Sequence, residues 1–336
     1  MKLILILIAM IHCAQAAESH QNVFLQPYNT PFESVPFNEI QLEDYTEALE
    51  KGLKEQEDYI QALATQPQAP TFENTIEALE KGSDILDRVT SVLFNLTEAA
   101  TCDQLDEIAN RYSPILSEAS NKVFQNKALF ERVKTVYQQE KDKLTGDKRK
   151  LLEDTYLTFI RSGANLNEQD KATFSALCSQ LSTETLTFGQ HVLKETNAYQ
   201  LHLTQEQDVA GLPATALASA QTKANEKGLE GWVFDLSMPS YLPFMQYAQN
   251  RELRKTLYMA YNQKGNQGGD NDNNQLVKDI VNNRLALAKL MNCEDYGSYK
   301  LQRNMAQNNE GVYRLLDQLR EVYYPKALQE KQQITA

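Results

Sequence analysis

EQDKATFSALCSQLSTETLTFGQHVLKET, residues 168–196, is the stretch with the clearest helical pattern. Its apolar stripe is made of residues three or four positions apart: Phe174, Leu177, Leu181, Thr185, Phe188 and Val192. Residues at this spacing lie on one face of an α-helix, because successive turns bring them into line. Asn167 and Asp170 resemble an N-cap that opens the helix. We therefore predict a long helix that packs this face against a core.

Helical spacing continues over most of the chain on both sides of this stretch. A first helix starts at Leu42 and should end before Pro67 and Pro70, because proline lacks the backbone donor that a helix needs. Two short β-rich runs, at about 199–203 and 232–236, are expected to pair as one small β patch. The other predicted helices cover residues 74–92, 103–122, 127–143, 147–162, 212–227, 240–263, 274–291, 294–306 and 309–336.

These elements predict a mainly α protein with a multi-helix lobe. At about 100–200 residues per domain, the length corresponds to one large or two ordinary domains. We expect an extended arm over 17–40 and an N-terminal helical domain over 41–197. Residues 198–336 should hold the β patch and the start of a second helical region. The last helix is still periodic where the sequence stops and has no Gly or Asn cap, so we expect it to be cut before its end.

The composition disfavours several classes of protein. The chain has 33 Lys and Arg against 45 Asp and Glu, a formal net charge of −12. Such a chain offers no cationic field to nucleic acid or to an anionic membrane, so we expect neither as a partner. Only 13 Gly and 10 Pro in 336 residues disfavour a turn-rich all-β fold.

Residues 1–16 have the features of a secretory signal peptide. Lys2 precedes an apolar run, and Ala14 and Ala16 supply the small residues of a cleavage site. We expect a mature chain that starts at Ala17 and is periplasmic or secreted. A lipid anchor on Cys13 is the alternative, and the bulky residue before it argues against that reading.

No catalytic, cofactor-binding or metal-binding residue is predicted in this chain. A helical zinc site of the HExxH type needs two histidines four residues apart, with Glu beside the first. None of the four histidines is followed by Glu, and His191 and His202 are eleven residues apart. Cys102, Cys178 and Cys293 are widely spaced and form no CxxC, which disfavours a thiolate zinc site. Phosphate-binding glycine loops and nucleophile-elbow motifs are also absent from the sequence.

The polar loop GNQGGDNDNN, residues 265–274, is the stretch to test for calcium binding. An EF-hand that starts at Asp270 needs Gly at its sixth position and Glu at its twelfth. Those positions hold Gln275 and Val281. We interpret the loop as a connector whose Asp and Asn residues cap the following helix.

A series of motifs along residues 24–330 resembles the N-terminal helical region of thimet-oligopeptidase-like zinc metallopeptidases. They include PTFENTIEALE at 70–80, FNL at 94–96, RSGANL at 161–166, FGQ at 188–190, ETNA at 195–198 and AGLP at 210–213. The match is densest in PSYLPFM at 239–245 and YAQNRELR at 247–254. Within that family the chain looks most like the bacterial peptidyl-dipeptidases, also called dipeptidyl carboxypeptidases.

The resemblance implies a neurolysin/thimet-oligopeptidase-like fold, in which two helical lobes flank a deep channel. In that family a HExxH helix and a downstream Glu hold the catalytic zinc, all within the C-terminal half. This chain matches the N-terminal half, so zinc is expected only in the full-length family member. A smaller departure is Met291-Asn292-Cys293, where a Gly is usual.

The leading hypothesis is the N-terminal portion of a peptidase that releases dipeptides from the C-terminus of short peptides. We expect this chain alone to be inactive, because it has no HExxH, so whether it acts as an enzyme is left open. One alternative is a stand-alone, non-catalytic helical module that binds peptides. Another is one half of a split peptidase that a separate C-terminal chain completes.

Overall fold

The computed structural model describes residues 20–82 and 84–335. The predicted signal peptide, residues 1–16, lies outside these residues. The described chain is mainly helical, which confirms the predicted fold class. Over the described ranges, no helix is both long enough and apolar enough to cross a membrane.

Six helices form the first part of the described chain. They are α2 (Leu42–Thr65), α3 (Asp84–Ala99), α4 (Asp103–Phe124), α5 (Lys127–Glu140), α6 (Gly146–Arg161) and α7 (Glu168–Ala198). A short π-helical segment, η4 (Phe72–Glu77), links α2 to α3. Before α2, the chain makes three 3₁₀ turns, η1 (Val23–Leu25), η2 (Pro31–Glu33) and η3 (Phe37–Glu39).

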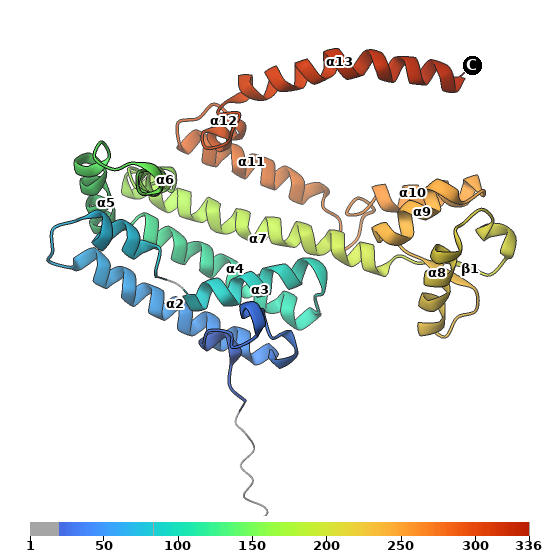
Figure 1. Ribbon diagram of the computed structural model, residues 1–336, viewed down its shortest axis with the longest axis horizontal. Helices are drawn as coiled ribbons and strands as arrows, with labels where there is room; N and C mark the ends of the chain where they lie inside the picture. Colours follow the sequence, from blue (N-terminus) through green and yellow to red (C-terminus); the bar gives the residue numbers. More distant parts are fainter. Residues whose placement is uncertain (1–19, 83, 336) are drawn as a thin grey trace, which may run out of the picture.

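The second part begins with a small sheet and continues as helices. Its elements are β1 (Leu201–Leu203), η5 (Glu206–Val209), α8 (Ala214–Glu226), β2 (Trp232–Phe234), α9 (Met238–Tyr247), α10 (Arg251–Asn262), α11 (Asn274–Leu290), α12 (Tyr296–Leu301) and α13 (Asn309–Thr335). The two strands pair antiparallel, with Leu201 opposite Phe234, at the places where the β patch was predicted. Figure 1 shows α7 running from the α5–α6 end of the molecule to the α8–β1 end.

The helices of the first part enclose two separate hydrophobic clusters. One cluster joins α2, α3 and α4 and includes Leu49, Val89 and Leu93, none of which has appreciable exposed surface. The other joins the C-terminal half of α2 to η4, α5 and α6 around Ile76 and Phe159. A third cluster lies under the small sheet and holds α8, α9 and α10 together.

The arm before α2 is anchored on the first cluster. The Phe24 side chain is fully buried there, and the Arg88 Nε atom donates to the Phe24 carbonyl oxygen at 3.0 Å. His20 Nε2 lies 2.7 Å from Asp44 Oδ1, at the start of α2. These contacts fix the arm along the first two helices of the bundle.

Three predicted helices are interrupted or shorter than expected. The predicted helix 74–92 breaks into η4 and α3, because the Tyr59 hydroxyl donates to the Ala78 carbonyl at 2.6 Å and the chain turns at Gly82. The predicted helix 240–263 breaks into α9 and α10, where Gln249 N donates to Ala210 O at 2.9 Å and Asn250 caps α10. Of the predicted helix 294–306, the structure forms only the six-residue α12 (Tyr296–Leu301).

The apolar stripe predicted for α7 is only partly buried. Asn167 does cap the helix, because its side chain accepts a hydrogen bond from Asp170 N at 2.9 Å. Phe174 is buried, but Thr185 and Phe188 are exposed. The prediction of one stripe against one core was wrong, because α7 packs between α4 and α11 and these helices contact different faces of it.

Candidate functional site

Two exposed apolar faces lie in the last part of the described chain. The α11 stripe consists of Val277, Val281 and Leu285, which follow at four-residue spacing and are all exposed. The α13 face is larger and consists of Leu315, Leu316, Leu319, Val322 and Tyr323. Within the described residues, α13 has no buried side chain along its 27 residues, and Val322 is 70% exposed. Contiguous apolar surface of this kind marks an interaction site.

The base of α13 is fixed although the helix itself is not packed. Asn309 Nδ2 donates to Asp295 Oδ2 at 3.2 Å and to Ser298 Oγ at 3.3 Å, which joins the start of α13 to α12. The α12 segment is held on α6, because Arg161 Nη1 donates to Tyr299 O at 2.7 Å and the Tyr299 hydroxyl donates to Arg161 O at 2.9 Å. Figure 1 shows α13 (red) running from this base along the top of the view, set apart from the helices of the bundle.

A row of polar contacts, here called the polar seam, positions α11 against α7. Glu184 is buried on α7, and Asn283 Nδ2 donates to its two carboxylate oxygens at 2.9 and 3.1 Å. At the start of α11, His191 Nδ1 lies 2.8 Å from Asn273 Oδ1. The loop before α11 is held to α7 by a hydrogen bond in which Gly265 N donates to Glu195 Oε2 at 2.6 Å. This seam sets the direction in which the α11 stripe points.

The histidines singled out in the sequence occupy separate places. His191 pairs with Asn273, and His202 Nε2 lies 2.7 Å from the Glu230 carbonyl oxygen. Across residues 20–82 and 84–335, no group of three His, Cys, Asp or Glu side chains could hold a metal ion. The zinc that the resemblance implies for the full-length family therefore does not fit the described residues.

The described cysteines are free thiols. Cys102 is exposed, and Cys178 and Cys293 are partly buried. Burial raises the pKa of the Cys178 thiol to about 11, so this side chain is protonated at neutral pH. A protonated thiol is a weak nucleophile, which disfavours a catalytic role for Cys178.

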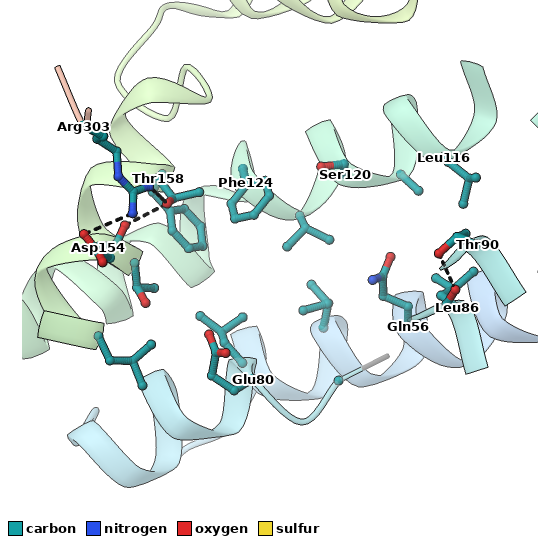
Figure 2. Close-up of a pocket in the computed structure, with 18 of the residues that line it drawn as sticks. Gln56, Glu80, Leu86, Thr90, Leu116, Ser120, Phe124, Asp154, Thr158 and Arg303 are labelled. Carbon is teal, nitrogen blue, oxygen red and sulfur yellow. Dashed lines mark hydrogen bonds and ion pairs between the residues drawn. The ribbon is translucent and has the colours of Figure 1, made fainter. Parts of the chain in front are cut away.

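A cavity of about 700 Å³ lies between the two clusters of the bundle. Figure 2 shows Arg303 and Asp154 at one end of it and Leu86, Thr90 and Leu116 at the other. Arg303 Nη2 lies 3.0 Å from Asp154 Oδ1, and Arg303 Nη1 donates to Thr158 Oγ1 at 2.8 Å. Arg303 comes from the turn after α12, so a residue of the second part closes one end of a cavity in the first.

Sequence reasoning missed the cavity and the α11 stripe. The stripe had a local signal, since Val277, Val281 and Leu285 recur every four residues, but that signal is equally typical of a packed helix. The cavity has no local signal, because its walls come from helices far apart in the sequence.

Comparisons with known proteins relate this chain to peptidases. Residues 244–336 match the model of peptidase family M3. Oligopeptidase A of Haemophilus influenzae is 32% identical over 304 residues, which cover 89% of this chain and 44% of that protein. The oligopeptidase A of Escherichia coli is 30% identical over 92% of this chain and 46% of its own length. The dipeptidyl carboxypeptidase of Escherichia coli is 30% identical over 89% of this chain and 44% of its own length.

The chain thus spans less than half the length of the curated relatives it matches. The identities to an oligopeptidase A and to a dipeptidyl carboxypeptidase are almost equal, so identity does not separate these two types of peptidase. The family match covers α10, α11, α12 and α13 in full, including both exposed apolar faces. Together these findings support a thimet-oligopeptidase-like peptidase of family M3.

Proposed function

We propose that this chain is the N-terminal portion of a zinc metallopeptidase that releases dipeptides from the C-terminus of short peptides. The family match and the peptidase names of its relatives support a role in peptide hydrolysis. One observation carries the proposal: the segment that matches family M3, residues 244–336, is also the segment with the exposed α11 stripe and α13 face. A peptidase segment with unburied apolar faces is suited to packing against more of the same domain.

The chain alone is proposed to be inactive on peptides. Family M3 is generally zinc-dependent, and hydrolysis in such enzymes relies on a metal that activates water. The printed sequence contains no HExxH, and the described residues offer no metal-binding group of three ligands. The role proposed for this chain is structural: its bundle and α11 would support one wall of a substrate channel.

The partner proposed for the α11 stripe and the α13 face is the part of an M3 peptidase that this chain does not match. Its relatives are more than twice as long as the stretch they share with this chain. Such a partner could be joined to this chain or supplied as a separate polypeptide. Burying the α13 face would remove large apolar side chains from water at roughly 25 cal/mol per Å².

Residues 1–16 are proposed to direct the protein to the periplasm or out of the cell. The charged start, the apolar run and the Ala14–Ala16 cleavage pattern support this. Sequencing the N-terminus of the protein from a periplasmic extract checks it, and Ala17 is the expected first residue. An N-terminus that retains residues 1–16 would contradict secretion.

The function is tested with the purified 336-residue chain, an unblocked peptide and added zinc. We expect no dipeptide release from the chain alone, and release after mixing with the unmatched part of the Escherichia coli dipeptidyl carboxypeptidase. Dipeptide release by the chain alone that a chelator abolishes would overturn the proposal that this chain is inactive without the unmatched part. Tight peptide binding by a soluble, monomeric chain without hydrolysis would favour the stand-alone binding module instead.

A further inference from the structure

The outer surface of α9 and α10 carries an exposed group of aromatic and sulfur side chains. The Tyr241 and Tyr261 rings stack with their centres 4.2 Å apart, and the Tyr261 hydroxyl donates to Met238 Sδ at 3.6 Å. Tyr258 precedes Tyr261 by three positions on α10 and is 50% exposed. Figure 1 shows α9 and α10 beside each other at the α8–β1 end of the molecule. We call Met238, Tyr241, Tyr258 and Tyr261 the tyrosine cluster.

The tyrosine cluster combines the residue types that protein interfaces favour. Tyrosine offers a large ring with a polar tip, methionine adapts its shape to different partners, and both are enriched where proteins bind other chains. Tyr241 and Tyr261 also pack against the third hydrophobic cluster, so they are held from beneath. Such a surface is suited to holding an aromatic side chain of a partner.

Two lysines border the tyrosine cluster. Lys255 precedes Tyr258 by three positions and is exposed, and Lys264 Nζ lies 4.0 Å from the centre of the Tyr261 ring. Lys264 is partly buried, and this burial lowers the pKa of its ammonium group. Within the residues that the structure describes, neither lysine forms an ion pair with a carboxylate. Both ammonium groups are therefore open to a carboxylate from a partner.

The acidic residues near this surface do not cancel its charge. Residues 238–264 contain four basic residues and one acidic residue, Glu252. Asp208 adds a carboxylate at the start of α10, and Asp235 before α9 is paired with Lys223. The surface formed by α9 and α10 therefore keeps a positive charge.

The net negative charge of the chain lies elsewhere. Residues 199–336 contain 15 basic and 15 acidic residues, so the formal charge of −12 belongs to residues 1–198. Charges more than about 8–10 Å apart are largely screened at physiological salt. A short anionic ligand on the tyrosine cluster would meet the local positive charge, whereas a long polyanion such as nucleic acid would also meet the acidic bundle. The charge distribution thus favours a short acidic ligand.

We propose that the tyrosine cluster binds a short acidic peptide segment that carries an aromatic side chain. The aromatic ring would lie on Tyr258 and Tyr261, and the flanking carboxylates would lie at Lys255 and Lys264. The stretch from Lys255 to Lys264 spans roughly 13 Å along α10, which an extended peptide covers in about four residues. This binding does not depend on the proposed peptidase activity, so either proposal can fail without the other.

The proposal is tested by fluorescence anisotropy with the full chain and labelled, end-blocked pentapeptides. The acidic probe is Asp-Glu-Phe-Glu-Asp, and two control peptides replace either its acids by the corresponding amides or its Phe by Ala. We expect the acidic probe to bind weakly and less well at high salt, and each control to bind at least about threefold more weakly. A control peptide that binds as tightly as the acidic probe, or a short oligothymidine that binds more tightly, would overturn the proposal.

Two variants locate the binding surface. Lys255→Glu and Tyr258→Ala should each weaken binding of the acidic probe about fivefold, the scale of one ion pair or one aromatic contact. Lys127→Glu is the matched control, because Lys127 is exposed on α5 at the other end of the molecule (Figure 1). All three side chains are exposed, so the variants should fold, and circular dichroism checks this. Unchanged binding in either variant, or an equal loss in Lys127→Glu, would overturn the proposal.

Discussion

Helices α7 and α13 are both long and both carry apolar residues at helical spacing, yet only one of them is packed. The 31-residue α7 lies between α4 and α11 and buries Phe174, Glu184 and Gln190. The 27-residue α13 buries none of its described side chains. The difference shows that a periodic pattern specifies which face of a helix favours burial, whereas a partner must be present for burial to occur.

The contacts of α7 show what such a partner supplies. Ser182 Oγ lies 2.6 Å from Ser113 Oγ on α4, and Asn283 on α11 satisfies the buried Glu184 carboxylate. These polar contacts accompany apolar packing, and among the described residues of α7 Gln190 Nε2 is buried without a hydrogen-bond partner. For α13, the comparable contacts among the described residues lie at its base, through Asn309 and the α12 segment.

The largest expected effect is the loss of packing at α7. Phe174→Ala removes a buried ring, 3% exposed, and should lower the free energy of unfolding by about 3–5 kcal/mol. Tyr323→Ala on α13, where the ring is 65% exposed, should change it by less than about 0.5 kcal/mol. Urea denaturation followed by circular dichroism measures both. Equal losses in the two variants would mean that α13 is packed in solution.

A smaller effect is expected at the polar seam between α7 and α11. Asn283→Leu removes the Nδ2 group that donates to both Glu184 carboxylate oxygens and should cost about 1–3 kcal/mol, because Oε2 then loses its donor while Oε1 keeps the hydrogen bond from Gln180 Nε2 at 2.8 Å. Val281→Ala on the same helix is the control, since Val281 is exposed. If the two substitutions cost the same, the seam does not hold α11 on α7.

A pH-dependent contribution is expected where the base of α13 meets α6. Hydrogen bonds from Lys150 and Arg303 hold the pKa of Asp154 below its usual value. A lowered folded-state pKa contributes stability above the unfolded value of about 3.9, and this contribution is lost as the pH falls below it. Asp154→Asn should therefore cost under about 1 kcal/mol at pH 6 and nothing near pH 2. Thermal melts across this range measure it, and Asp317→Asn on α13 should show no such trend.

The smallest effect on stability is expected on the α13 face itself. Leu316→Glu combined with Leu319→Glu should change the free energy of unfolding by less than about 0.5 kcal/mol, because both side chains are exposed. The same double variant should reduce the self-association of the chain, measured by light scattering and sedimentation. The control Gln332→Glu with Gln333→Glu adds equal charge away from the face. A wild-type chain that is monomeric at high concentration would contradict the expectation that the α13 face drives self-association.

The sequence predicted the helices well and their interruptions poorly. The predicted ends of α6, α8 and α11 lie within two residues of the observed ones, because apolar spacing and caps are local signals. The break after η4 depends on the Tyr59 hydroxyl, and the break before α10 depends on the Ala210 carbonyl. Both partners come from other segments and have no local signal, whereas Gly82 at the first break and the Asn250 cap at the second are local signals.

The candidate sites also divide into features with a local sequence signal and features that depend on the packing of distant segments. The histidine and cysteine spacings predicted no metal or catalytic centre, and those are properties of the sequence alone. The pairing of His191 with Asn273 and the position of Glu80 beside a cavity depend on how the helices are placed.

The sequence by itself determined the helical content, the small β patch, the acidic surface and the kinship to peptidases, because spacing, composition and motifs are written along the chain. Only the tertiary structure decided that α4 and α11 cover α7, that two clusters leave a cavity between α2, α3, α4 and α6, and that the α13 face is exposed. The physical reason is that burial depends on two surfaces, and the second surface comes from a distant part of the chain.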